Sequence, residues 1–419
     1  MKFVLIIFTL IGFQVAVQAE ERGSSATAEL VGIAYFPADR FVDGPVSGQF
    51  IEAKKDAAYA DILPFSLGQP VQGFSAIVDE GAGSYLVLPD NGFGSKQNSA
   101  DFVLRLYRIR PDFRTAQGGS GMVELESSIL LNDPYSQTPF GRIADIEYVS
   151  FNGKAIAVST LIRQQSLLTG SDYDPESLQV MEDGSFWVGE EFGPWLLHFD
   201  RVGRLLDPPY SLPSVSSPNN PVLGDREALA ASSGGFEGMA MDQVRQKLYP
   251  MLEKPLAGGK RELLIYPFDL KQKRFIEDET MRYPLDEGST AVGAIQSLGE
   301  GRFVVVERDS KEGKAAQIKR VYRIDEKQTD DSGVLRKMLM ADLLKIHDPA
   351  HLADSDTDSS NSIYRYSFHT IESLVVMGHD KLGLVNDNNY PFGNGPGGEA
   401  DDVAEETVFI VIKVPGLMD

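Results

Sequence analysis

The sequence contains no cysteine among its 419 residues. This absence excludes disulfide bonds, thiol catalysis and thiolate zinc sites. Histidine is also scarce, with five residues in the whole chain, and none of them shows the H-E-x-x-H spacing of a zinc hydrolase. The G-x-S-x-G sequence of an α/β-hydrolase is missing as well. Oxygen donors are therefore the main candidates for any metal site, which favours calcium or magnesium over zinc or copper.

Positive charge is in deficit, with 39 basic residues against 61 acidic residues and a net charge of −22. This balance argues against nucleic acid or an anionic membrane surface as the main partner. It is compatible with bound cations. The same excess would also arise if the acids serve only to keep an exported protein soluble.

Long apolar runs are missing except at the N-terminus. Lys2 is followed by a mostly apolar stretch over residues 3–17, and small residues around Ala19 suit a cleavage site. The stretch is too short for a confident membrane span. We predict that residues 1–19 are a signal peptide and that the protein is periplasmic or secreted after cleavage near Ala19.

The composition of the remaining chain predicts a large folded domain with many turns. Hydrophobic residues make up 42 %, and there are 40 glycines and 23 prolines, which favour short strands over long helices. After a leader at 20–28 we expect one domain over 29–415. Two stretches are expected as loop insertions: 207–225 is rich in Pro, Ser and Asn, and 335–361 begins with helix-like apolar spacing and ends acidic.

A two-strand unit recurs along this domain. Each copy has an acidic or small residue, an apolar strand, a turn, a second apolar strand and a polar cluster. The copies lie at 73–94, 143–164, 174–195, 235–256, 292–310 and 370–392, with that at 143–164 the weakest. Outer strands follow several copies.

Six such units predict an all-β fold, a six-bladed β-propeller with its blades around a central channel. The apolar segments 29–36 and 407–414 suit strands of one shared blade, which would close the ring and remove an open edge. A pair of β-sandwiches is the alternative, but it explains the repeated signature less well.

Polar residues fall at equivalent positions of the repeat. Glu176, Glu237 and Glu372 stand at the start of the first strand, where the first copy has Ser75. The end of the second strand carries our predicted metal ligands: Asp90, Asn91, Glu190, Glu253, Glu307, Asn386 and Asp387. In a propeller these positions approach one end of the axis, where the carboxylates would repel one another. Calcium, which takes about six to eight oxygen ligands, would relieve the repulsion, with magnesium as a second possibility. Alternatively, the acids cap strand ends or pair with nearby basic residues.

Four segments resemble an exported bacterial protein family, the "esterase-like activity of phytase" or phytase-like domain. They are GFSAI with LVLPDNGFG, DPESLQVMEDGSFWVGEEFGP, GFEGMAM and TIESLVVMGHDKLGLVNDNNYPF, in the family's order. The family's D-P-E-S, G-E-E-F, F-E-G and N-D-N-N segments fall on 174–177, 189–192, 236–238 and 386–389. The unit at 143–164 departs from this pattern. The resemblance implies a β-propeller that hydrolyses an ester or phosphomonoester with the assistance of calcium.

The leading hypothesis is an exported, calcium-dependent hydrolase that acts as a monomer on a small phosphomonoester or related ester. The candidates for catalytic residues, one of them a general base, are Glu176, Glu191, Glu237 and Glu372. The candidates for substrate binding are Arg163, Lys254, Arg308 and Asn388. Two alternatives stay open: a non-catalytic, calcium-stabilised propeller that binds in the cell envelope, and a carboxyl-ester or lactone hydrolase.

Overall fold

The computed structural model describes residues 27–52, 59–353, 357–358, 362–393 and 404–419. The predicted signal peptide and most of the leader lie outside these residues. Strands dominate the described residues, and the one α-helix among them is α1 (Thr160–Gln164). The all-β prediction is confirmed.

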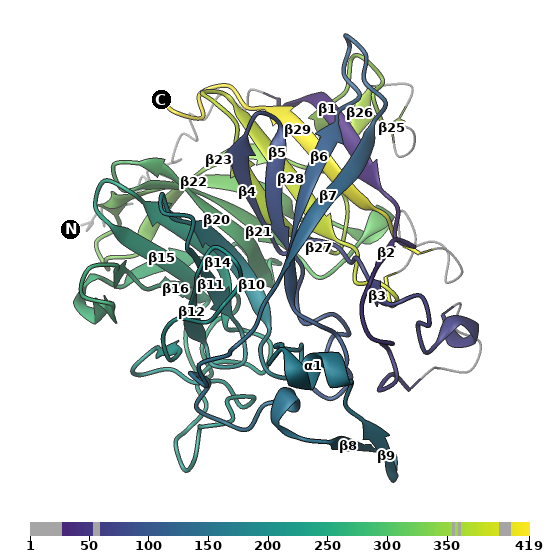
Figure 1. The fold of residues 1–419 in the computed structure, drawn as a ribbon. Helices are drawn as coiled ribbons and strands as arrows, with labels where there is room; N and C mark the ends of the chain where they lie inside the picture. The colour runs from purple at the N-terminus through teal and green to yellow at the C-terminus, as the bar shows by residue number, and fades with distance from the viewer. Residues whose placement is uncertain (1–26, 53–58, 354–356, 359–361, 394–403) are drawn as a thin grey trace, which may run out of the picture.

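Five sets of antiparallel strands, which we call the first to fifth sheets in chain order, radiate from a common centre (Figure 1), and a parallel bridge joins the first and the last set into one larger sheet. The innermost strands are β4 (Ala76–Gly81), β10 (Pro175–Val180), β14 (Phe236–Asp242), β20 (Ala291–Gly299) and β27 (Thr370–Val376). The second strands are β5 (Ser84–Leu88), β11 (Phe186–Glu190), β15 (Lys247–Leu252), β21 (Arg302–Arg308) and β28 (Lys381–Asp387). The outer strands are β6 (Arg105–Asp112) and β7 (Met122–Leu130), β12 (Trp195–Phe199) and β13 (Tyr210–Ser211), β16 (Glu262–Ile265) and β19 (Met281–Pro284), β22 (Lys319–Thr329) and β23 (Leu335–Asp342), and β29 (Thr407–Lys413) and β1 (Glu29–Phe36).

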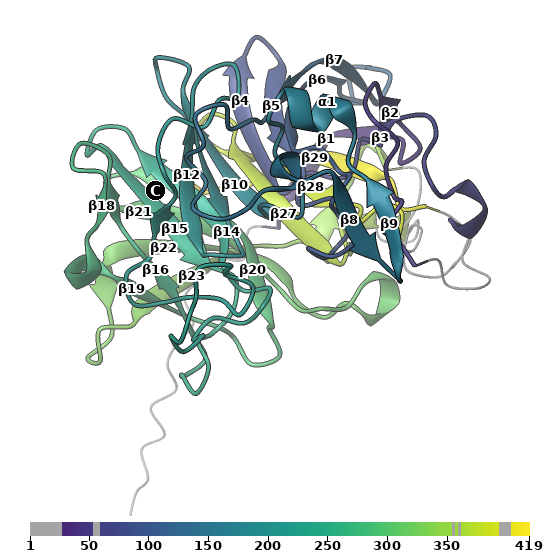
Figure 2. The ribbon, with the colours of Figure 1, turned by 60° about the horizontal axis from the view of Figure 1, so that its bottom comes forward.

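The inner strands close into a ring. In order around it, β4 contacts β10, β10 contacts β14, β14 contacts β20, β20 contacts β27, and β27 contacts β4 (Figure 2). Five hydrophobic clusters fill the spaces between neighbouring sheets. In β11, for example, Phe186 and Val188 pack toward the first sheet, whereas Trp187 packs toward the third. This two-residue alternation gives each sheet two buried faces, as a β-propeller requires.

The two ends of the described chain close the ring, as predicted. β1 pairs antiparallel with β29 from Glu29 opposite Lys413 to Phe36 opposite Thr407. β29 in turn pairs with β28, so β1 belongs to the last sheet, and its single parallel bridges to β7 and β24 extend the sheet further. This arrangement ties the first strand to the last blade.

The number of blades differs from the prediction, because the unit at 143–164 does not join the ring. β8 (Tyr148–Phe151) and β9 (Lys154–Ala157) pair only with each other and form a hairpin near α1, at the bottom of Figure 1. The physical reason is their exposure: neither strand contains a buried residue. A blade needs a buried apolar surface on both faces, and this hairpin has only one partly buried apolar face, which contains Val149, Phe151 and Ile156. The described residues therefore form five blades.

The two expected insertions also differ from each other. Residues 207–225 are irregular apart from β13, as expected. The segment 335–361 instead begins with β23, which pairs with β22 along the outer edge of the fourth sheet. Leu335 and Ala341 are buried there while the residues between them are partly or fully exposed, so the apolar spacing is that of an edge strand and not of a helix. Residues 354–356 and 359–361 lie outside the described residues.

The smaller elements lie in the connections and at the sheet edges. They are β2 (Phe41–Val42), β3 (Gln69–Pro70), β17 (Phe268–Asp269), β18 (Arg274–Phe275), β24 (Ile346–His347), β25 (Thr357–Asp358), β26 (Ile363–Tyr364), η1 (Ala60–Ile62), η2 (Ile143–Asp145), η3 (Glu277–Glu279) and η4 (Gly313–Ala315). The connections before each inner strand and after each second strand meet at one end of the ring, because the two strands are antiparallel. This end carries the polar residues of the repeat.

Candidate functional site

Four inner strands begin with a β-bulge at the same position. The residues left out of the pairing are Glu176, Glu237, Gly293 and Glu372. A bulge re-aims the side chain of its extra residue, and bulges are frequent beside functional sites. In the first sheet Ser75 holds the matching place, where its backbone N–H donates to the carbonyl of Leu88 at 2.9 Å.

The pairing register divides the ends of the second strands into two sets. Residues of the first set pair with the residue just before each bulge and turn into the blades: Glu190, Leu252, Glu307 and Asn386. The residues that follow them turn toward the axis, because successive side chains of a strand point to opposite faces. These are Glu191, Glu253, Arg308 and Asp387, with Asp90 in the matching place of the first sheet.

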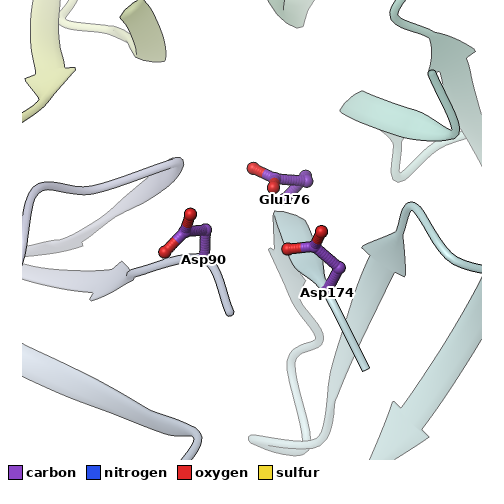
Figure 3. Close-up of side chains that lie close together, drawn as sticks. All are labelled: Asp90, Asp174 and Glu176. Atoms are coloured by element: carbon purple, nitrogen blue, oxygen red, sulfur yellow. The ribbon is translucent and has the colours of Figure 1, made fainter. Parts of the chain in front are cut away.

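Carboxylates from four of the sheets therefore meet at the axis. We call the following residues the axial carboxylates: Asp90, Asp174, Glu176, Glu191, Glu237, Glu253, Glu372 and Asp387. Two triads stand out among them, in each of which one oxygen per residue lies within 4.8 Å of the others. Figure 3 shows the first triad, Asp90, Asp174 and Glu176, with its carboxylates around a shared space. The second triad is Glu191, Glu237 and Glu253.

Two basic residues balance the second triad. Arg308 is buried, and its Nη2 lies 3.0 Å from Glu253, 3.3 Å from Glu372 and 3.6 Å from Glu237. Although burial opposes its charge, these carboxylates raise the pKa of Arg308. Lys254 Nζ lies 2.5 Å from the other oxygen of Glu253. Within the described part of the chain, no basic side chain lies within ion-pair distance of the first triad.

The fourth sheet supplies no carboxylate at its bulge. A Cβ atom on Gly293 would lie 1.9 Å from the carbonyl oxygen of Ile371 on the neighbouring inner strand. No side chain fits there without moving the backbone. The guanidinium of Arg308, from the end of β21, is thus the contribution of the fourth sheet to the axis.

The pKa values of seven axial carboxylates are raised: Asp90, Asp174, Glu176, Glu191, Glu237, Glu372 and Asp387. Burial raises the pKa of Asp90 to about 6 and that of Glu372 to about 7. Burial, followed by repulsion from neighbouring carboxylates, raises the pKa of Asp174, Glu176 and Glu191 well above their ordinary values. Without a further cation, these groups cannot all be ionised at neutral pH.

The residues present fit a hard cation such as calcium. Every candidate ligand donates oxygen, the donor that calcium and magnesium prefer. Asn91 Oδ1 and Glu237 Oε1 are among the buried side-chain oxygens of the described residues that have no hydrogen-bond partner. A cavity of about 20 Å³, room for about one water molecule, lies beside Ser75, Ser177 and Glu237.

Two of the predicted metal ligands, Glu190 and Glu307, make hydrogen bonds within the blades and do not face the axis. The Glu190 carboxylate accepts hydrogen bonds from the backbone N–H groups of Phe192 (2.9 Å) and Gly193 (2.7 Å). Glu307 accepts a hydrogen bond from the hydroxyl of Tyr283 at 2.6 Å and pairs with a lysine of β23 at 2.5 Å. Both carboxylates belong to the set that faces away from the axis.

Three further candidates also lie outside the axial group. Asn386 Oδ1 accepts a backbone N–H of β29 at 2.7 Å, and Asn388 Oδ1 accepts the N–H of Gly73 at 2.9 Å. Both amides fix the connections of the last blade. Arg163 lies on α1, where it pairs at 3.3 Å with the exposed Glu147. The hydrogen bonds and the ion pair of these three side chains go to groups other than the axial carboxylates.

Asp174 is a site residue that was not among the candidates. It lies two residues before Glu176, and in an extended strand two residues on the same chain face the same side. Its carboxylate also accepts the backbone N–H of Asn91 at 3.2 Å. The spacing of the D-P-E-S segment was the signal from which it could have been found.

Comparison with known proteins adds the family. The model of the phytase-like family, described as "esterase-like activity of phytase", matches residues 69–390. The chain belongs to this family. All of the axial carboxylates lie within the matched residues. A curated relative of this phytase-like chain is an uncharacterized secreted protein of Arthroderma benhamiae, 24 % identical over 290 residues. The match covers 56 % of each chain, and this relative is fungal, so the similarity extends beyond bacteria.

Similar solved structures include two glycosidases. A GH43 β-1,3-galactosidase in complex with galactodeoxynojirimycin has a TM-score of 0.41 and 12 % identity, covering 88 % of this chain and 94 % of that one. A glycosyl hydrolase from Bacteroides ovatus has a TM-score of 0.38 and 10 % identity with the same coverage. The propeller fold of the phytase-like chain is established by its own strand pairing. A search of the described residues for a membrane-spanning helix finds none.

Proposed function

We propose that this phytase-like protein is an exported hydrolase of phosphomonoesters or related esters that works with bound calcium. The first triad carries the proposal, since three carboxylates lie together there with no basic partner in the described part of the chain. Membership of the phytase-like family and the description of its relative as secreted support the reaction class and export. Export would follow cleavage of the predicted signal peptide.

The residues that would hold calcium are those of the first triad. Asp90, Asp174 and Glu176 supply carboxylate oxygens, and Asp387 and the unpartnered amide oxygen of Asn91 lie close by in the same group of loops. When bound, calcium supplies positive charge against an anionic ester group. The protein's part is to hold the oxygens in place on the rigid ends of the strands.

Glu191 is the best candidate for the general base. Glu237 and Glu372 are paired with Arg308, and Glu176 belongs to the first triad. Glu191 remains, held by a hydrogen bond from the backbone N–H of Gly235 at 3.2 Å. Burial and the neighbouring carboxylates raise the pKa of Glu191, which makes its ionised form a stronger base, and this form would take a proton from the attacking water.

Lys254 and Arg308 would act on the carboxylates rather than on the substrate. Both are already paired with Glu253. Each therefore holds a neighbouring carboxylate in place. An anionic ester at the axis would depend on the bound metal for its counter-charge, so chelation should abolish phosphate ester hydrolysis.

The test is hydrolysis of p-nitrophenyl phosphate beside p-nitrophenyl acetate, each with calcium and with a chelator. We expect calcium-dependent release of nitrophenol from the phosphate ester, reduced about 10²–10⁴-fold by Glu191→Gln. Glu147→Gln, at an exposed position away from the axis, is the control and should keep full activity.

Two other outcomes would move the assignment. Turnover of the acetate alone would indicate a carboxyl-ester or lactone hydrolase. Inactivity on both esters, in a protein that calcium stabilises against unfolding, would indicate a non-catalytic propeller.

A further inference from the structure

A cavity of about 760 Å³ lies beside the segment that leads into β10. Its wall includes Ser171 and Asp172, which immediately precede the first triad's Asp174 in the chain. The β8–β9 hairpin, which does not form a blade, supplies the opposite wall through Val149 and Phe151, and Figure 2 shows this hairpin in front of the ring. The volume falls within the range of about 300–1,000 Å³ that is usual for small-molecule sites.

Lys96 supplies a cation at this cavity. Its Nζ lies 5.2 Å from the centre of the Phe192 ring and 5.5 Å from that of Phe140, both within the range of cation–π contact. The side chain is half-buried. Among the described residues, no carboxylate lies within ion-pair distance of this ammonium group. Phe192 directly follows Glu191 in the chain, so the end of the second strand of this blade supplies both the proposed general base and a ring that contacts Lys96.

The rest of the lining is apolar or uncharged. Ile143, Phe151 and Pro221 provide apolar surface, and Asn152 provides an uncharged amide. The one acidic residue, Asp172, already accepts hydrogen bonds from backbone N–H groups on both of its oxygens, at 2.9 Å and 2.8 Å. The cavity therefore matches an organic group with an apolar body and a negative charge.

We propose that this cavity binds the organic part of the ester and that Lys96 recognises a second anionic group, a carboxylate or phosphate, on that part. The inference rests on the proposed function, because the reacting ester group is assigned to the neighbouring axial carboxylates. It names the substrate class: esters whose apolar body carries an additional negative charge.

The test compares two non-hydrolysable probes by calorimetry in calcium: phenylphosphonate, and 4-carboxyphenylphosphonate, which carries the second anion. The wild-type protein should bind the carboxylated probe about tenfold more tightly, as expected for a partly desolvated charge pair. Lys96→Met, which keeps the contact with the phenylalanine rings, should abolish this preference, and Lys96→Arg should restore it. Lys154→Met, an exposed change on the same hairpin outside the cavity lining, is the control and should keep the preference.

Equal affinity for the two probes, no binding of either, or a preference that survives Lys96→Met would each overturn the proposal. The readout needs no turnover, so the two proposals fail separately. A Lys96-dependent preference in a protein without hydrolytic activity would support the cavity and overturn the hydrolase. Hydrolytic activity in a protein without this preference would support the hydrolase and overturn the cavity proposal.

Discussion

Replacement of Arg308 by methionine should strongly destabilise the calcium-free protein. The guanidinium is buried and lies 3.0 Å from Glu253 and 3.3 Å from Glu372. Methionine keeps much of the volume of the side chain but removes its charge. The carboxylates around it would then lose the cation that compensates their burial.

The size of the effect follows from the loss of one partner from a buried charge group, which costs about 3–5 kcal/mol of unfolding free energy. Protonation of the carboxylates offsets part of this cost at low pH. Burial already raises the pKa of Glu372 to about 7, and the loss of Arg308 would raise it further. We therefore expect the full loss at pH 8, where the wild-type pair is ionised, and a smaller loss at pH 5.

The assay is urea unfolding in a chelator at both pH values, followed by the fluorescence of the buried Trp187 and Trp195. Arg163→Met is the matched control, because this arginine pairs with an exposed glutamate and its loss should cost less than about 1 kcal/mol. If Arg308→Met unfolded at the wild-type urea concentration at pH 8, the compensating role of Arg308 would be refuted.

Three further predictions follow from the same geometry. The calcium-free protein should lose stability as pH rises from about 4.5 to about 7, because the unfolded state releases the proton of Glu372 before the folded state does. Glu372 alone should account for a loss of about 3 kcal/mol of unfolding free energy. Added calcium should reverse this loss in thermal melts. Melting temperatures that rise over this range in a chelator would contradict the raised pKa. Gly293→Ala should lower the free energy of unfolding, measured in urea, by at least about 1–3 kcal/mol, because the added Cβ would clash with the carbonyl of Ile371. A variant as stable as the wild type would show that the two strands are not this close. Glu307→Gln should lower stability without changing calcium affinity in a titration, whereas weaker calcium binding would place this carboxylate at the axis.

Much of the fold could be predicted because each copy of the repeat shows the two-residue alternation of apolar side chains that is typical of strands. The same repeat marked Glu176, Glu237 and Glu372, and the structure brings all three to the axis. The blade number was wrong because 143–164 shares the hairpin spacing of the other units. Its strands lack the buried faces that a blade needs, and exposure of this kind depends on the neighbours.

The choice between adjacent residues at the strand ends could not be made from the sequence. Glu190 and Glu191 are both acidic, and only the bulge beside Glu176 determines which of them faces the axis. The partners of Arg308 were hidden for a similar reason, since they come from two other blades. Contacts between segments that are distant in the chain form only when the ring closes, so a local sequence pattern cannot predict them.

The most direct test of the account is a calorimetric titration of chelator-treated protein with calcium, for the wild type and for Asp174→Asn. The account predicts that the wild type binds calcium and releases protons as it does so, because the raised pKa values leave axial carboxylates partly protonated at neutral pH. Asp174→Asn should weaken binding at least about tenfold, as expected when a charged ligand of the site is lost. Absence of calcium binding in the wild type, or equal affinity in Asp174→Asn, would contradict a calcium site at the axial carboxylates.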